Sequence, residues 1–455
     1  MKGQRSGECR VGSKRSQSPR RRTSYSRELL GAIGRFLPHR GLPLQLPGVK
    51  IAWTPRLLVI CALLMFMSKA QSLKDRFAEA RQATVSMYPS RRRPGKTYQG
   101  FIDKLAGSSE PLLALLCDAL RQAVRQIAGA AHWNVEGWTL FAVDGTRVEC
   151  PMTAANEKRL GCAGKSKTTP QQFLTMLLHL GTGLPWGWQI GPGTSSERGH
   201  LCKMIPLLPE KSMLVADAGF VGYDLLGEII AAGHCFVIRV GSNVRLLKKL
   251  GFAVREYADI VYLWPEKKRK RQAPMVLRLV KISDGRKTVN LLTSVLEKSK
   301  LSDACIGRIY RRRWGIELYY RSMKQTMGNR KMLSDSPAHA LVELNWCVAS
   351  LWILGLMTVS ELIDAGKSPG EISVASALRV VREAMRQGRR CCAKDHLRRQ
   401  LATAARDGYR RTRPRKARHW PHKKREKPPG EPKIKPATRA EIRLARQVLK
   451  QRVAA

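Results

Sequence analysis

One segment of the chain, IYRRRWGIELYYRSMK, combines four chemically different polar side chains at helical spacing. If the segment is an α-helix, each residue advances about 100° around the axis, and the four side chains fall within an arc of roughly 60°. They are Tyr310, Arg313, Glu317 and Lys324. A phenol, a guanidinium, a carboxylate and an ammonium group would then face the same way. The same spacing also fits a solvated helix face with an ion pair between Arg313 and Glu317, although the flanking aromatic residues favour a packed helix.

Two aspartates accompany apolar runs that are typical of buried β-strands. Asp144 lies within LFAVDGTRV, and Asp217 follows MLVA and precedes Ala-Gly-Phe. A carboxylate at the carboxyl end of a buried strand stands where α/β sheets place their ligand sites. Asp-Gly is also a strong hairpin signal, so position alone leaves Asp144 open between a turn and a site residue. A turn is the alternative for Asp217 too, and nearby Asp224 is expected to cap a helix.

Three carboxylates on separate elements suit phosphoryl transfer assisted by two divalent ions. Two ions about 3.5–4 Å apart need oxygen ligands that bridge and flank them. One ion generates the nucleophile from water or a 3′-hydroxyl, and the other stabilises the leaving oxygen. Mg²⁺ prefers oxygen ligands and retains several waters, so three carboxylates are enough, and Mn²⁺ would serve as a substitute. Basic residues beside such a site would hold the phosphodiester.

The charge of the chain points to a polyanionic partner. Its 455 residues include 83 Lys and Arg against 34 Asp and Glu, which gives a formal net charge of +49. The segments 1–28 and 409–436 together contribute +17, so about two thirds of the charge lies on the body of the protein. A compact protein this positive repels itself until a polyanion neutralises it. Double-stranded DNA is the expected partner, with a membrane surface as the weaker alternative.

Neither a membrane span nor a cysteine-based site is expected. The longest apolar run, Leu57 to Met67, is too short to cross a bilayer. The stretch Leu341–Met357 is long enough, but it contains Glu343, which favours a buried core helix. The 11 cysteines are scattered and include no Cys-x-x-Cys pair, so neither a disulfide framework nor a zinc site is implied. These features fit a cytoplasmic, nucleoid-associated protein.

The first half of the chain divides into three segments by composition and periodicity. Residues 1–50 read as a basic, Ser/Pro-rich arm that is expected to be flexible. Residues 51–135 show helical periodicity in two runs, separated by the basic loop Arg91–Pro94. Residues 136–245 follow the order three strands, helix, strand, helix, strand, which favours an α/β fold with a mixed sheet.

The second half adds three more segments. Residues 246–298 contain strand-like runs without helices, and Asp284-Gly285 is expected to form a hairpin turn between two of them, so this segment reads as a β-rich insertion. Two long helices are expected over 299–384, the first spanning the Glu317 segment. Residues 385–455 return to a basic, Pro-rich tail.

Together the three acidic motifs resemble one known family, the insertion-sequence-4-like group of DDE transposases. That group carries a Tyr-x2-Arg-x3-Glu-x6-Lys signature, which YRRRWGIELYYRSMK matches at every spacing from Tyr310 to Lys324. FAVDGT and VADAGF resemble its first-acid and second-acid strands. The acids are 73 and 100 residues apart, and the long second interval is similar to the β-strand insertion of the group. The resemblance covers roughly residues 138–360.

The resemblance implies a ribonuclease-H-like catalytic core with a mixed sheet. The core is interrupted by the β-rich insertion, preceded by the helical segment and flanked by the basic arms. The implied catalytic residues and ligands of two Mg²⁺ ions are Asp144, Asp217 and Glu317. The implied contacts to transposon-end DNA are Tyr310, Arg313 and Lys324. That fold carries its first acid on its first strand. The resemblance therefore implies that Asp144 is a site residue and not part of a hairpin turn.

Members of the group excise their element at terminal inverted repeats and join the 3′ ends to target DNA. The resemblance therefore implies a cut-and-paste transposase that binds both DNAs and works as a homodimer, because two ends must be brought together. Residues 51–135 are the expected reader of the repeats. Some members form hairpin ends supported by a tryptophan of the insertion. Trp264 is a candidate by location, although a packed tryptophan is favoured.

Two alternatives to transposition stay open at this point. A catalytically inactive copy, or another basic nucleic-acid-binding protein, would bind DNA without metal-dependent cleavage. A cellular nuclease of the same fold would cleave DNA without joining ends. Basic runs such as KKRKR at 267–271 would bind phosphates under all of these readings, without reading sequence.

Overall fold

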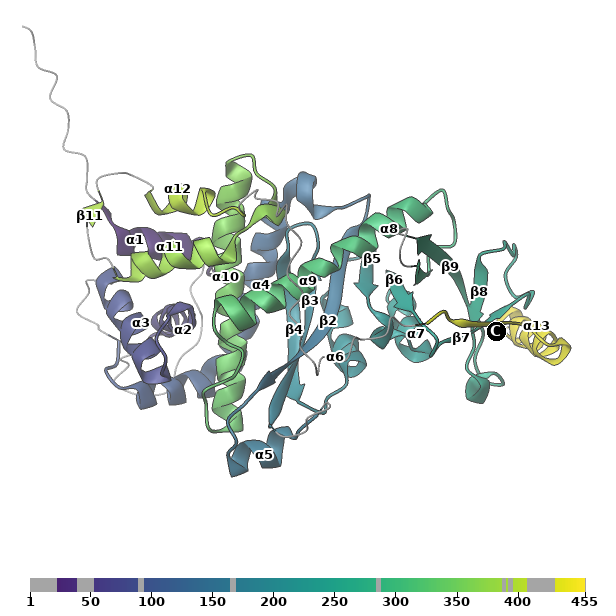
Figure 1. Cartoon of the computed structure of the whole chain (residues 1–455), viewed down its shortest axis with the longest axis horizontal. Helices are drawn as coiled ribbons and strands as arrows, with labels where there is room; N and C mark the ends of the chain where they lie inside the picture. The colour runs from purple at the N-terminus through teal and green to yellow at the C-terminus, as the bar shows by residue number, and fades with distance from the viewer. Residues whose placement is uncertain are drawn as a thin grey trace, which may run out of the picture.

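The computed structural model describes residues 23–38, 53–88, 94–163, 169–283, 288–386, 390–391, 396–406 and 430–454. Within these ranges the protein is a mixed α/β structure around a ten-stranded sheet. Figure 1 shows a group of helices at one end of the sheet and the helix of the C-terminal segment at the other. The expected α/β class with a mixed sheet is confirmed.

The centre of the sheet comes from the segment that contains both aspartate motifs. Three antiparallel strands are followed by two strands parallel to the first, in the spatial order β4-β3-β2-β5-β6. These strands are β2 (Thr139–Glu149), β3 (Gln171–His179), β4 (Leu184–Pro192), β5 (Ser212–Ala216) and β6 (Cys235–Val240). The helices between them are α5 (Ala154–Leu160), α6 (Glu197–Met204) and α7 (Tyr223–Ala231). The expected order of strands and helices is found, with α5 in addition.

The β-rich segment extends this sheet rather than forming one of its own. Its strands are β7 (Arg245–Lys248), β8 (Ile260–Leu263), β9 (Met275–Ser283) and β10 (Thr288–Thr293). They join the core because β10 runs antiparallel along β6, from Asn290 opposite Val240 to Thr293 opposite Val237. The Asp284-Gly285 turn expected between β9 and β10 lies outside the described residues.

The helical end of the molecule is built around one apolar helix, α10 (Pro337–Asp364). Within the described residues it is the one helix long and apolar enough to cross a membrane, but 94% of its most apolar window is buried inside the protein. A helix that is apolar on all sides needs neighbours all round, which agrees with the expected core helix. Its neighbours include α2 (Pro55–Met67), α4 (Tyr98–Trp133), α11 (Val374–Arg386) and α12 (His396–Ala402). Helix α3 (Leu73–Met87) packs against α2.

Part of the expected flexible arm is folded. Residues Tyr25–Gly34 form helix α1, and its Leu29 and Ile33 are fully buried among the other helices. Just beyond it, Arg35 forms an ion pair of 2.7 Å with Glu361 of α10. The prediction was wrong here because the basic composition of the arm concealed one short amphipathic run, ELLGAIGRFL. The rest of the arm, 1–22 and 39–50, lies outside the described residues.

The end of the expected tail is also folded. Strand β12 (Lys433–Pro436) pairs in parallel with β7, and helix α13 (Arg439–Ala454) follows it. Ala445 of α13 is buried in a cluster with Leu250, Tyr262 and Trp264. The edge of the sheet at β7 offers unpaired backbone groups, and the tail satisfies them. Residues 407–429, which hold most of the basic Pro-rich run, lie outside the described residues.

Candidate active site

The pairing register of β2 and β5 places the two aspartates side by side. Thr139 lies opposite Ser212, and Ala142 lies opposite Val215, so each residue of β2 faces the residue 73 positions later. Asp144 and Asp217 are also 73 residues apart, and both stand just beyond the last paired residues. Neighbouring strands are about 4.8 Å apart, and residues in register point to the same face. The two carboxylates therefore share one face of the sheet, just beyond the point where the parallel pairing of β2 and β5 ends.

Asp144 lies within β2 opposite Met176 of β3, so the turn interpretation of its Asp-Gly is wrong. The Asp144 carboxylate accepts a hydrogen bond of 2.9 Å from the Gly145 N–H. Asp217 directly follows β5, and its Oδ1 accepts a hydrogen bond of 2.9 Å from the Gly219 N–H. Each aspartate is thus bonded to the backbone N–H of the glycine in its own motif, within the strand for Asp144 and in the turn after the strand for Asp217.

The Glu317 segment packs against the same end of β2. The expected single helix consists of α8 (Asp303–Arg312), α9 (Trp314–Arg321) and a π-helical turn over Ser322–Thr326. The buried Tyr320 hydroxyl donates a 2.7 Å hydrogen bond to the backbone oxygen of Asp144. The Lys324 Nζ donates to Thr146 Oγ1 and to the Arg147 oxygen, both at 2.7 Å. These bonds hold the third acidic motif over the first.

Glu317 is bonded to an arginine in this structure. Arg313 Nη2 donates to Glu317 Oε1 at 2.7 Å, and the Arg313 side chain is only 15% exposed. The same guanidinium lowers the pKa of Asp144 electrostatically and lies 5.7 Å from the ring centre of Tyr310. Within the described ranges, no three His, Cys, Asp or Glu side chains are close enough together to hold a metal ion. The structure thus brings Asp144 and Asp217 together. Glu317 is linked to this pair only by way of the Arg313 guanidinium, which is bonded to Glu317 and acts electrostatically on Asp144.

A fourth carboxylate, Glu197, occupies the space between the two aspartate motifs. It is the first residue of α6. A Cβ atom on Gly145 would stand 2.8 Å from Glu197 Oε1, and one on Gly219 would stand 3.3 Å from Glu197 Oε2. The Glu197 carboxylate therefore rests against the glycines that follow Asp144 and Asp217. The sequence does not reveal this residue as part of the site, because SERGH reads only as the beginning of a helix, and an acid in the first turn of a helix is ordinary.

Burial and the charges of neighbouring carboxylates raise the pKa values of Asp144 and Glu197. The pKa of Asp144 is raised to about 7, mainly by burial and also by the charges of Asp217 and Glu197, against the lowering effects of the Gly145 N–H and Arg313. Burial and the charge of Asp217 raise the pKa of Glu197, while Arg147 and Arg198 lower it. Close, buried carboxylates resist ionisation together. A bound cation would relieve this repulsion, and carboxylate oxygens are the type of ligand that Mg²⁺ prefers.

The Asp144→Asn variant is expected to be more stable than the wild type at neutral pH in the presence of EDTA. Because the pKa is 3.8 for an ordinary aspartate and about 7 here, the folded state binds more protons between these values, and stability falls as pH rises through them. Asparagine removes this cost, a gain on the order of 1–4 kcal/mol at pH 8. Thermal unfolding at pH 4 and pH 8 checks this. An equal difference at both pH values would contradict it.

The three predicted DNA contacts differ in their surroundings. Lys324 is half-buried, and burial lowers its pKa; its ammonium group is bonded to β2 as described. Burial raises the pKa of Tyr310, although the nearby Arg313 and Arg239 act in the opposite direction. The π-helical turn changes the number of residues per turn before Lys324, so the simple helical projection does not extend to that residue. Tyr310 lies in the last turn of α8, and Arg313 directly follows the last residue of that helix.

Two other sequence predictions are decided by the structure. Trp264 is 3% exposed, and its indole N–H donates to the Gln272 oxygen at 2.8 Å, so the packed interpretation is confirmed. Asp224 is not an N-cap, because helix α7 begins earlier, with Gly222 as its cap. The Asp224 carboxylate instead pairs with Lys268 at 2.5 Å.

Comparisons with known proteins connect this site with transposases. Residues 138–353 match the family described as "Transposase DDE domain". The chain is 27% identical over 224 residues to "Transposase InsG for insertion sequence element IS4" of Escherichia coli (strain K12), which covers 47% of this chain and 49% of that protein. It is 24% identical over 183 residues to "Putative transposase for insertion sequence element IS4SA" of Synechocystis sp. (strain ATCC 27184 / PCC 6803 / Kazusa), covering 40% and 52%.

The chain spans about half the length of the curated relatives it matches. Among solved structures, it is similar to a chain of "Cryo-EM structure of piggyBac transposase synaptic complex with hairpin DNA (SNHP)". That similarity has a TM-score of 0.43 and 13% identity over 87% of this chain and 89% of that one. The matched family region contains all three acidic motifs and the segment that carries Glu197.

Proposed function

We propose that the protein is a DNA transposase that cuts the ends of an insertion sequence at terminal inverted repeats and joins them to target DNA. The observation that carries this proposal is the register that sets Asp144 beside Asp217, with the Glu317 helix bonded to the same strand. The match to a transposase DDE domain over 138–353 and the similarity to two insertion-sequence transposases support it. The strand order β4-β3-β2-β5-β6 fits a ribonuclease-H-like core.

In this proposal Asp144, Asp217 and Glu317 hold two Mg²⁺ ions, which would activate a water or 3′-hydroxyl and stabilise the leaving oxygen. Glu317 is available once Arg313 releases it, and the Arg313 guanidinium is then free to bond a phosphate oxygen. In this proposal Tyr310 and Lys324 would contact the DNA backbone. Tyr320 keeps the helix α9 aligned with β2 through its bond to Asp144.

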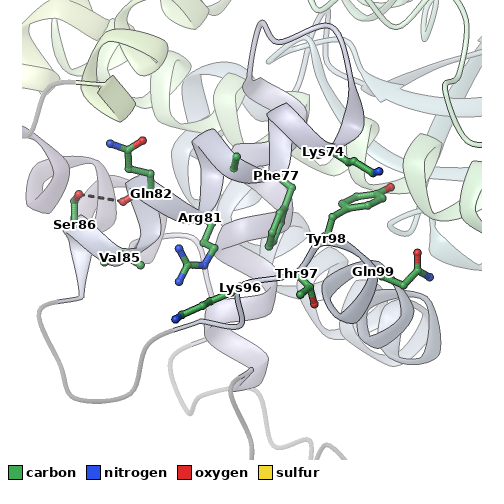
Figure 2. A pocket seen from close by; sticks show the side chains of 11 residues that line it. Lys74, Phe77, Arg81, Gln82, Val85, Ser86, Lys96, Thr97, Tyr98 and Gln99 are labelled. Carbon is green, nitrogen blue, oxygen red and sulfur yellow. Dashed lines mark hydrogen bonds between the residues drawn. The ribbon is translucent and has the colours of Figure 1, made fainter.

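DNA binding is expected to extend to the helical end of the protein. Between α3 and the beginning of α4 lies a hollow of about 800 Å³, which Figure 2 shows from close by. Lys74, Arg81 and Lys96 line it beside Phe77 and Tyr98. Lys74 and Lys96 are exposed to solvent. Cations on an open surface suit phosphate oxygens, which position a duplex without reading its sequence.

The proposal predicts cleavage and joining that require a divalent ion. The purified protein, incubated with duplexes that carry the inverted repeats flanking its gene, is expected to cut at the repeat ends with Mg²⁺ or Mn²⁺ and to transfer the 3′ ends to a plasmid. EDTA is expected to stop both steps while DNA binding persists. Cutting without joining would indicate a nuclease instead, and binding without cutting would indicate an inactive copy.

The complex of the protein with its repeat duplexes is expected to contain two copies of the chain, because two element ends must be held together. Light scattering of the protein with and without repeat duplexes measures this directly. A complex with one chain and one duplex under all conditions would contradict the paired-end arrangement.

A further inference from the structure

A basic groove lies at the end of the sheet that the C-terminal segment completes. Its volume is about 730 Å³. It is bounded by β7, by the loop that follows β8, by the beginning of α7 and by β12. Its basic side chains are Arg198, Arg245, Lys267, Lys268, Arg269, Lys433 and Lys435, and its acidic ones are Glu266 and Glu441.

One wall of this groove is supplied by residues beyond the matched family region. Lys433 lies opposite Arg245, and Lys435 lies opposite Leu247, in the parallel pairing of β12 with β7. Lys433 and Lys435 are two residues apart in a strand, so their side chains point to the same face, and both are exposed. The wall is anchored by the buried Ala445 of α13 and by the ion pair between Arg269 and Glu441.

The positive charge of the groove is not balanced by its own acids. Glu266 pairs with Arg245 at 3.4 Å, and Glu441 pairs with Arg269. Lys268 is held by Asp224 at 2.5 Å. Lys267, Lys433 and Lys435 form no ion pair in the part of the chain that the structure describes. Three exposed ammonium groups thus remain available to an anionic ligand.

The groove is continuous with the candidate active site through Arg198. This residue follows Glu197, and its Nε donates a 2.9 Å hydrogen bond to the oxygen of Gly219, in the second aspartate motif. Its Nη1 also lies 3.0 Å from the position of a Cβ on Gly222, so the guanidinium rests on the beginning of α7. Arg198 lines the groove as well. A ligand that extends from Asp217 along Arg198 would enter the groove.

We propose that the C-terminal segment 430–441 forms, with Arg198 and Lys267, a binding groove for the phosphate backbone of the DNA that leaves the cleavage site. This inference rests on the proposed function for the identity of the ligand. Each DNA strand carries one negative charge per 3.4 Å of helix axis, so an extended backbone can contact several of these cations at once. The exposed, elongated row of cations fits such a polymer better than a single small anion.

The test is the double variant Lys433→Ala/Lys435→Ala in the full chain, with Arg446→Ala/Lys450→Ala as the matched control. The control removes the same charge at two exposed positions of α13, which follows β12 and on which neither position lines the groove. Binding to a duplex that contains the repeat end and its flank is measured from 50 to 200 mM NaCl in EDTA. The slope of log K against log salt is expected to fall by about 1.8 for the groove variant, for two lost phosphate contacts, and by less than about 0.5 for the control.

Equal slopes for the groove variant and the control would overturn the proposal. Thermal unfolding of each protein checks that β12 stays folded, and Lys433→Gln/Lys435→Gln gives a second variant that removes the charges but keeps polar side chains. Because binding is measured in EDTA, the outcome is independent of cleavage. If the wild-type protein never cuts DNA, the proposed function fails, but the groove proposal can still hold. If the wild-type protein cuts DNA and the groove variant keeps the wild-type salt slope, only the groove proposal fails.

Discussion

The Asp217→Asn variant is expected to lose DNA cleavage by roughly 10³-fold or more, because several kcal/mol of transition-state charge stabilisation depend on the ions that this carboxylate would hold. Asparagine has nearly the same shape and keeps an oxygen that can accept the Gly219 N–H, so the fold should survive. The register pairs this residue with Asp144, and Asp144→Asn should behave alike. The measurement is the initial rate of nicking at repeat ends, with affinity for the same duplex measured in parallel.

The Asp118→Asn variant is the control for this loss. Asp118 is an exposed aspartate of α4 that pairs with Arg121 at 2.5 Å, and it lies outside the candidate site. Its variant should cleave at the wild-type rate. Retained cleavage by Asp217→Asn would remove that residue from the catalytic group, and parallel loss of DNA binding would indicate a folding defect instead.

The second large effect is expected at Glu197. Its carboxylate rests against the glycines that follow both aspartates, so Glu197→Gln should weaken Mn²⁺ binding and cleavage by roughly 10–100-fold, as is usual for groups that support metal ligands. Because burial and Asp217 raise the pKa of Glu197, removing its charge should not lower the thermal stability of the protein. Mn²⁺ affinity is measured by electron paramagnetic resonance.

Glu210→Gln, at an exposed position after α6, is the matched control and should leave Mn²⁺ affinity unchanged. Glu197→Asp keeps the charge and should restore part of the affinity. If Glu197→Gln binds Mn²⁺ as tightly as the wild type and only unfolds earlier, the residue has a packing role and no part in the metal site.

The sequence alone predicted the elements that carry the site because their signals are local. Apolar runs that end in an acid predicted β2 and β5, and the helical spacing predicted the Glu317 helix. The α/β class followed from the alternation of these runs. The adjacency of Asp144 and Asp217 came from the family resemblance. The structural basis of this adjacency is the pairing register of β2 and β5, which aligns residues that are 73 positions apart.

The remaining features depend on contacts between distant segments. Glu197 meets Gly145 across 52 residues, and nothing in SERGH indicates that approach. Strands β7 and β12 pair although nearly 190 residues separate them in the sequence. The basic composition of the tail gives no indication of this pairing. The sequence predicts the ion pair between Arg313 and Glu317 as a surface pair. It does not predict that the Arg313 side chain is mostly buried in this pair.

The central claim is that Asp144, Asp217 and Glu317 together hold divalent ions over a phosphodiester. The direct measurement is the anomalous scattering of Mn²⁺ in crystals of the protein with a repeat-end duplex. We expect two Mn²⁺ peaks bounded by these three carboxylates, with Glu317 released from Arg313. Crystals in which DNA is bound, Mn²⁺ is absent from Asp144 and Asp217, and the Arg313–Glu317 pair is intact would contradict the account.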